Sequence, residues 1–167
     1  DVETKAKEEQ KDKDKKSGGS GGGSGGNSGG GGSSPVIDSD QEAVNAEAAK
    51  YEEIAVIEGN ITAGTDVTDT VAKLKAGKIP VSSIILSYAV SSGKYLEVVD
   101  NAVKVKAQNT NDDDATETVT IIFTKNGKTA TKNVTVTIKS SIVAKIGENK
   151  YQSLLEAINA ADNGATI

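Results

Sequence analysis

Apolar and polar residues alternate on both sides of Asn126-Gly127, and this alternation is the clearest structural signal in the chain. The pair favours the positive φ angles of a two-residue type I′ turn, which joins two antiparallel strands. A turn here predicts three cross-strand pairs on one apolar face: Phe123 with Ala130, Ile121 with Lys132, and Val119 with Val134. The opposite face is predicted to be polar: Thr118, Thr120, Thr124, Thr131, Thr135 and Thr137, interrupted by Ile122. This pattern is typical of a half-buried antiparallel sheet.

Residues 82–92 have the composition of a further strand, with Ile84, Leu86 and Tyr88 predicted on one side and Ile85 on the other. Two more β segments follow, at residues 95–99 and 101–108. In the second segment Val103, Val105 and Ala107 are predicted to point inward. Strands at this spacing, separated by turn signals, predict a two-sheet sandwich of about 100 residues.

Residues 67–80 fit two secondary structures. The spacing of Val67, Val71 and Leu74 suits a helix, whereas the β-branched content of the segment suits a strand. We expect the segment to be extended.

A helix is predicted from about residue 40 to residue 53. Ser39 and Glu42 match a capping box at its start. One narrow apolar stripe follows at helical spacing, formed by Val44, Ala48, Tyr51 and Ala55. We expect Tyr51 to pack on the core.

The end of the chain predicts a strand at residues 142–146, a turn at 147–150 and a short helix. Ser153 and Glu156 match a second capping box, and Gly164 is expected at the C-cap. The helix is predicted to carry one apolar face: Leu154, Leu155, Ala157, Ile158 and Ala161.

Residues 17–34 contain only Gly, Ser and one Asn, and they hold eleven of the eighteen glycines of the chain. Such a tract has no side chains to bury and is predicted to be a flexible tether. Residues 1–16 are almost entirely charged or polar and are predicted to be disordered. We therefore divide the chain into a disordered linker at 1–34, a folded domain at 35–140 and a separate C-terminal unit at 141–167.

Several absences restrict the chemistry. The chain has no His, Cys or Trp, and all of its positive charge comes from Lys. It therefore lacks the commonest general base, thiolate chemistry and bidentate arginine clamps, and we expect neither an enzyme nor a cofactor or metal site. The net charge is −5 and no basic face is evident, so we expect no nucleic-acid binding. No apolar run is long enough for a transmembrane segment.

The segment from Ser87 to Ser140 resembles the atrophied bacterial immunoglobulin-like domains of secreted and surface proteins. The resemblance rests on the residues from Tyr88 to Val99, on Asn101-Ala102-Val103 in place of a short G-x-V strand, and on the closing hairpin. It covers residues 38–140 approximately. It implies an immunoglobulin-like β-sandwich, with a mostly β fold and an N-terminal helix. It also implies a spacer role and brings no catalytic residues.

Residues 141–167 resemble the start of a right-handed parallel β-helix of the pectate-lyase-like kind. In this interpretation the short amphipathic helix closes the open end of a solenoid core. Thr166-Ile167 would begin the first rung. The resemblance implies that a longer protein continues beyond this segment.

A few residues suggest other chemistry. The acidic loop from Asn109 to Asp114 could bind calcium through oxygen ligands, although it lacks the glycine and glutamate of a calcium loop. Lys132, predicted to face inward, allows a lysine–asparagine crosslink, whereas plain snorkelling of its ammonium is the ordinary alternative. Glu52 and Glu53 are paired acids, and Gly127-Lys128-Thr129 superficially resembles a phosphate loop. Solvated surface positions or a turn explain both patterns.

The sequence thus favours a non-catalytic structural spacer that presents a neighbouring domain of the same polypeptide. We expect it at a bacterial cell surface or in the extracellular space, with lipid or wall anchorage as open alternatives. One alternative function is the N-terminal accessory region of a β-helix polysaccharide lyase or hydrolase. The other is an adhesion module that binds a cell-wall glycan or a protein.

Overall fold

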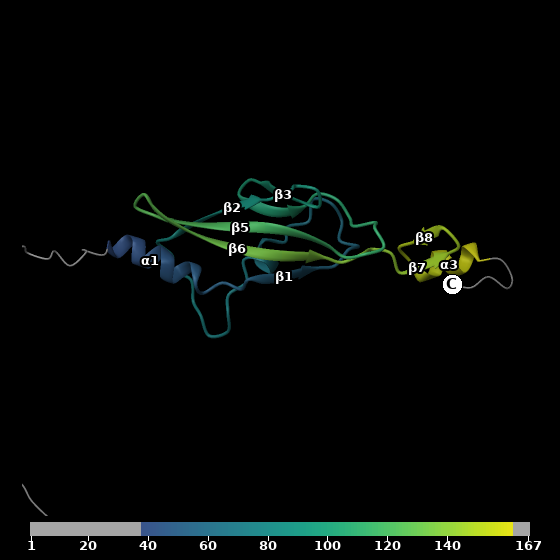
Figure 1. The fold of residues 1–167 in the computed structure, drawn as a ribbon, viewed down its shortest axis with the longest axis horizontal. Coiled ribbons are helices and arrows are strands. Elements are labelled where there is room, and N and C mark those ends of the chain that lie inside the picture. The colour runs from purple at the N-terminus through teal and green to yellow at the C-terminus, as the bar shows by residue number, and fades with distance from the viewer. Residues whose placement is uncertain (1–37, 162–167) are drawn as a thin grey trace, which may run out of the picture. The chain divides into compact units, whose positions relative to one another are not determined.

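The computed structural model describes residues 38–161 of the chain. The fold in this range is mostly β. Figure 1 shows the elements in chain order: α1 (Ser39–Ala48), β1 (Ile54–Ile57), α2 (Thr68–Val71), β2 (Ile85–Val90), β3 (Leu96–Val99), β4 (Ala102–Val105), β5 (Ala115–Lys125), β6 (Lys128–Ile138), β7 (Ala144–Ile146), β8 (Asn149–Tyr151) and α3 (Leu154–Ala160). None of the described helices is long and apolar enough to cross a membrane.

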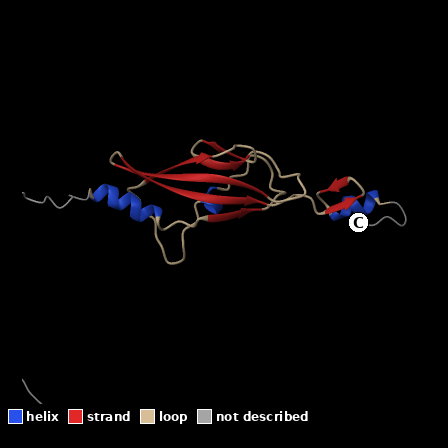
Figure 2. Ribbon diagram, viewed as in Figure 1, coloured by secondary structure: helices blue, strands red, loops and turns tan. Residues whose placement is uncertain are grey.

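The strands form one main sheet and two small ones (Figure 2). The main sheet has the order β1-β6-β5-β2. Strand β1 runs parallel to β6, whereas the β6–β5 and β5–β2 pairs are antiparallel. Strands β3 and β4 form a separate antiparallel pair, and β7 and β8 form another.

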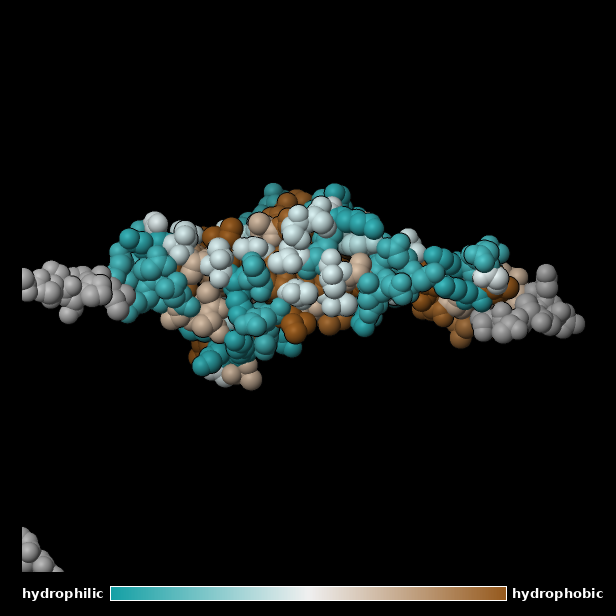
Figure 3. Space-filling model, in the orientation of Figure 1, coloured by the Kyte–Doolittle hydropathy of each residue, from teal (hydrophilic) through white to brown (hydrophobic). Residues whose placement is uncertain are grey.

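The β5–β6 hairpin has the predicted turn and register. Asn126 has a φ of 48° and Gly127 a φ of 80°, as a type I′ turn requires. All three predicted pairs are present: Phe123 with Ala130, Ile121 with Lys132, and Val119 with Val134. The threonine face is exposed or half-buried, also as predicted. Figure 3 shows weakly polar side chains, drawn pale, among teal and brown ones in the middle of the face in view.

The core lies between the inner face of the main sheet and a layer formed by α1, α2 and the β3–β4 pair. Phe123 and Ile121 on β5 are fully buried, as are Val44 on α1 and Val103 on β4. The ring of Tyr51 packs against Phe123 with 5.1 Å between centroids, so Tyr51 lies on the core as the stripe predicted. The two layers therefore share one hydrophobic cluster.

Helix α1 differs from its prediction at both ends. Its N-cap is Asp38 rather than Ser39: the Asp38 carboxylate accepts hydrogen bonds from the backbone N–H groups of Asp40 (3.0 Å) and Gln41 (3.4 Å). The helix ends at Ala48 instead of continuing to residue 53. Backbone groups of residues 50–52 are instead hydrogen-bonded to residues 73–75, which ends the helical ladder.

The extended conformation expected for residues 67–80 is wrong at its start. Residues 68–71 form the single turn of α2, whose N-cap is Val67 without a side-chain capping bond. Just before it, the Asp66 carboxylate accepts a hydrogen bond from the N–H of Thr68 (2.8 Å), which bends the chain into a local turn. The preceding residues 64–67 run beside β4, where the N–H of Val67 donates to the carbonyl of Val103 (2.9 Å). Strand β4 ends at Val105, so Ala107 is exposed rather than inward.

The C-terminal part contains a hairpin that the sequence interpretation missed. The predicted turn at 147–150 is shorter, and residues 149–151 form β8 against β7. Ser153 is the N-cap of α3 but makes no side-chain capping bond. Ala157 of α3 is buried, whereas the predicted apolar face is largely exposed: Leu154 by 56%, Leu155 by 65% and Ile158 by 51%. Gly164 and Thr166-Ile167 lie outside the described residues, as does the predicted tether at 1–34.

Candidate functional site

A hollow of about 620 Å³ opens at the edge of the main sheet, beside β2. We call it the Tyr88 hollow. Three chain segments line it: residues 66–70 around the start of α2, alternate residues of β2, and the turn between β3 and β4. Its lining is Asp66, Val67, Thr68, Asp69, Thr70, Leu86, Tyr88, Asn101 and Ala102.

The hollow exists because the second layer is narrower than the main sheet. Leu86 and Tyr88 point to the inner face of the edge strand β2, but the opposing pair β3–β4 has only two strands and leaves both half-buried. Asp100 and Asn101 form the β3–β4 turn with φ angles of 52° and 58°. Asn101 Nδ2 donates a hydrogen bond of 2.9 Å to the carbonyl of Leu86, which fixes this turn against β2.

The hollow is negatively charged. Hydrogen bonds from the Thr68 hydroxyl and backbone N–H lower the pKa of Asp66, so this carboxylate is ionised at neutral pH. Burial raises the pKa of Tyr88, and the negative charges of Asp69 and Asp66 raise it further. The Tyr88 phenol therefore remains protonated at neutral pH and can both donate and accept a hydrogen bond. In the described part of the chain, lysine side chains do not line the hollow, although the charge of Lys104 on β4 also lowers the pKa of Asp66.

Two of these groups have unused hydrogen-bonding capacity. Within residues 38–161, neither the Asp69 carboxylate, which is exposed to solvent, nor the hydroxyl of the half-buried Tyr88 forms a hydrogen bond to another protein group. Polar groups directed into a concave surface with an aromatic wall are typical of a ligand site. This is the best candidate for a binding site in the described part of the chain.

The acidic loop is a structural junction, which accounts for its composition without calcium. Asn109 is fully buried, and its amide donates to the carbonyls of Asp113 (2.9 Å) and Ile138 (3.1 Å). The carbonyl of Asn109 accepts from the backbone N–H of Ser141 (2.7 Å) and from its hydroxyl (2.9 Å). The loop thus holds the segment that leaves β6.

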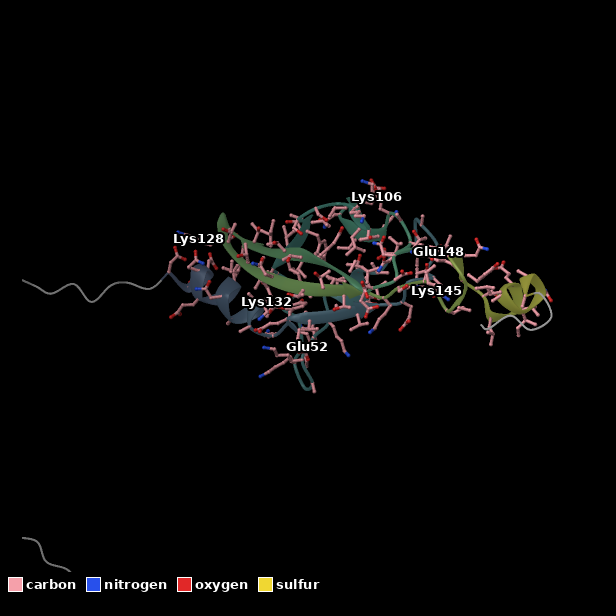
Figure 4. The ribbon with its side chains drawn as sticks, turned by 45° about the vertical axis from the view of Figure 1, so that its right-hand side comes forward. Glu52, Lys106, Lys128, Lys132, Lys145 and Glu148 are labelled. Carbon is pink, nitrogen blue, oxygen red and sulfur yellow. The ribbon has the colours of Figure 1, made fainter. Side chains whose placement is uncertain are left out.

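Lysine side chains form ion pairs with two carboxylates of this loop. Asp114 pairs with Lys139 at 2.8 Å, and Asp112 pairs with Lys145 at 2.8 Å and Lys150 at 3.0 Å. Hydrogen bonds from these lysines lower the pKa of both aspartates. Figure 4 labels Lys145 on β7. In residues 38–161 no three acidic side chains converge in a way that could hold a metal ion.

The other sequence candidates also have local partners. The Lys132 ammonium forms an ion pair with Glu53 rather than contacting an asparagine, and only 15% of the Lys132 side chain is exposed. Glu53 is therefore engaged and is not free to act with Glu52 as an acid–base pair. Lys128 lies in the hairpin beside α1 and pairs with Asp38 at 2.9 Å, so Gly127-Lys128-Thr129 forms a turn and not a phosphate loop (Figure 4).

The sequence interpretation did not identify two buried carboxylates, Glu117 and Glu47, and both have structural roles. Glu117 on β5 accepts hydrogen bonds from the N–H groups of Lys94 (2.8 Å), Tyr95 (2.9 Å) and Leu96 (3.2 Å). Glu47 on α1 binds the ammonium of Lys50 at 2.7 Å and accepts from the N–H of Val81 (3.2 Å). Because these carboxylates are satisfied by backbone and lysine donors, they are not available for acid–base chemistry.

The sequence interpretation also missed three residues of the Tyr88 hollow, namely Asp66, Asp69 and Asn101. Asp100-Asn101 is a pair that tolerates positive φ, so the turn could have been recognised.

Comparison of the chain with protein-family models, with curated proteins and with solved structures gave no match.

Proposed function

We propose that this chain is a non-catalytic structural spacer of a bacterial cell-surface or secreted protein. The proposal includes an immunoglobulin-like sandwich over residues 35–140. The strand order supports it, because β2, β5 and β6 correspond to the C, F and G strands of that fold. Residues 64–67, β4 and β3 would then correspond to strands B, E and D, since residues 64–67 hydrogen-bond to β4 and β4 pairs with β3.

The path of the chain through the sandwich carries the proposal. Helix α1 begins beside the β5–β6 turn, where Asp40 pairs with Lys125 at 3.0 Å and accepts a hydrogen bond from Asn126. The chain leaves at the opposite end of β6, after Ile138. Because β6 has eleven residues, these points are separated by about 35 Å along the strand. A chain that enters at one end and leaves at the other is suited to hold its neighbours apart.

The terminal strands resist extension along this path. Strand β1 is parallel to β6, with Ala55 opposite Val136 and Ile57 opposite Ile138. The N–H of Thr135 donates to the carbonyl of Glu53 (2.8 Å), and that of Lys139 donates to Ile57 (2.9 Å). Tension between the two ends would load these hydrogen bonds together in shear. A spacer with this geometry would retain its length under moderate force.

The C-terminal unit fits the proposed role of a β-helix cap. Leu154, Leu155 and Ile158 expose an apolar helix face, which the next layer of a solenoid would cover. The pairs from Lys145 and Lys150 to Asp112 tie β7 and β8 to the acidic loop. In this proposal these ion pairs fix the orientation of the presented domain relative to the spacer.

Force spectroscopy of the full chain tests this proposal. The chain is held by its two ends and extended, and we expect an abrupt step when the sandwich unfolds. The 103 residues from 38 to 140 span about 360 Å when extended at about 3.5 Å per residue, so the step should add roughly 300 Å once the folded length is subtracted. Gradual lengthening at low force, without a step, would contradict a spacer role.

A further inference from the structure

We propose that the Tyr88 hollow binds a carbohydrate, and that its ligand is an uncharged or amine-bearing oligosaccharide rather than a uronate. This inference adds a binding activity to the proposed spacer and does not depend on it. The hollow has a volume of about 620 Å³, which lies within the range of small-molecule sites.

One wall of the hollow suits the apolar face of a sugar ring. Tyr88 and Leu86 lie on the inner side of the edge strand β2, and within residues 38–161 both remain only half-buried. A pyranose presents a face of C–H groups, and an aromatic side chain packs against such a face while its polar end remains hydrogen-bonded. A half-exposed tyrosine at the rim of the core thus provides a stacking surface that the fold itself leaves open.

The remaining wall suits the hydroxyl groups of the same ring. The Asp69 carboxylate and the Tyr88 hydroxyl have no partner within residues 38–161. Asn101 uses its amide nitrogen to bind Leu86, and its oxygen remains as an acceptor. A ligand that satisfies this lining must offer several donors at once, as neighbouring sugar hydroxyls do. Hydrogen bonds to an ionised carboxylate are stronger than neutral ones, so Asp69 is expected to contribute most.

The charge of the hollow decides which sugars fit. Asp66 and Asp69 both line it, and lysine side chains do not. A uronate would place its carboxylate beside these two, and within residues 38–161 the one lysine whose charge acts on them, Lys104 beside Asp66, is not part of the lining. This arrangement is unfavourable for a third negative charge. A sugar with an ammonium group would instead gain attraction. The same charges therefore argue against an acidic polysaccharide as the ligand of this site.

The test is an NMR titration of the full chain with three probes of equal length: a neutral glucan tetrasaccharide, a glucosamine tetrasaccharide and a galacturonate tetrasaccharide. We expect the first two to shift the resonances of residues around the Tyr88 hollow, with the glucosamine probe binding more tightly. The galacturonate probe is expected not to bind. Absence of binding by both the neutral and the glucosamine probe at millimolar concentration would overturn the proposal, as would equal binding of the galacturonate probe.

Substitutions in the Tyr88 hollow then test whether the oligosaccharide binds there. Asp69→Asn and Tyr88→Phe are each expected to weaken binding at least about tenfold, which is the loss of one good hydrogen bond to a charged or buried group. Asp113→Asn and Tyr151→Phe are matched controls outside the hollow and should leave the affinity unchanged. Thermal unfolding of each variant separates lost binding from lost folding. Unchanged affinity in both hollow variants, with the fold intact, would also overturn the proposal.

Discussion

Glu117 holds the backbone of Tyr95 by a hydrogen bond of 2.9 Å from the Tyr95 N–H to the buried carboxylate. The neighbouring N–H groups of Lys94 and Leu96 donate to the same side chain. One acidic residue on β5 therefore fixes the loop that leads into β3, and the position of the β3–β4 pair depends on it.

Glu117→Gln should destabilise the protein by about 1–3 kcal/mol, because one acceptor oxygen is replaced by an NH2 group that faces backbone donors. Urea unfolding followed by circular dichroism measures the change. Glu148→Gln, at an exposed acid of the β7–β8 turn, is the matched control and should have an effect below about 0.5 kcal/mol. Equal effects of the two substitutions would show that the Glu117 contacts are not important for stability.

Gly59→Ala should also destabilise the fold. A β-carbon at this position would collide with the Lys139 carbonyl oxygen and would stand 2.5 Å from the backbone nitrogen of Ser141. Both obstacles are backbone, so the clash cannot be relieved by a side-chain rotation, and a loss of about 1–3 kcal/mol is expected. The midpoint of urea unfolding measures it. Asn60→Ala, at the next residue and with an exposed side chain, should be nearly neutral.

The stability of the protein should fall at alkaline pH because of Tyr51. Burial and the negative charge of Glu47 raise the pKa of Tyr51 to about 12, from an ordinary value of 10.0. The unfolded chain therefore ionises this phenol first. The stabilisation is complete below about pH 10 and is lost as the pH rises towards 12. Tyrosinate absorbance should show late-titrating phenols, because the pKa of Tyr88 is raised as well, and Tyr51→Phe should remove one of them. An unchanged late-titrating amplitude in this variant would refute the assignment.

The junction between the loop at residues 109–114 and the β7–β8 hairpin should loosen in acid. Hydrogen bonds from Lys145 and Lys150 hold the pKa of Asp112 below its ordinary value of 3.8. The ion pairs are present above that value and are lost as the pH falls through the lower, folded pKa. The protection factors of the amide hydrogens in residues 144–151, which correct for the intrinsic pH dependence of exchange, should therefore fall at low pH. Asp112→Asn should lower the same protection factors at neutral pH. Unchanged exchange in Asp112→Asn would show that other contacts hold the junction.

The sequence was most informative where one local signal determines geometry. Asn126-Gly127 fixes the turn, and a period of two then sets the register of β5 and β6 without further information. Secondary structure was harder to predict where two local signals compete. The Asp66 carboxylate bends the chain into a local turn despite the β-branched residues that follow it, and Asp38 caps α1 in place of the neighbouring Ser39.

The candidate site could not be predicted from the sequence, because its residues come together only in three dimensions. Asp66 and Asp69 precede Tyr88 by about twenty residues, and Asn101 follows it in another layer. Nothing in the spacing of these residues indicates that the β3–β4 pair is too narrow to cover β2. The burial of Glu117 was equally hidden, since its partners are backbone groups that any sequence provides.

The most direct measurement of the spacer account compares two pulling directions on the same protein. The chain contains no cysteine, so pairs of introduced cysteines provide unique attachment points. Handles at Ser39 and Ser140 load the parallel β1–β6 pair in shear, whereas handles at Glu58 and Ser140 pull the two strands apart from one end. The account predicts a clearly higher unfolding force for the first pair. Equal forces in the two directions would contradict it.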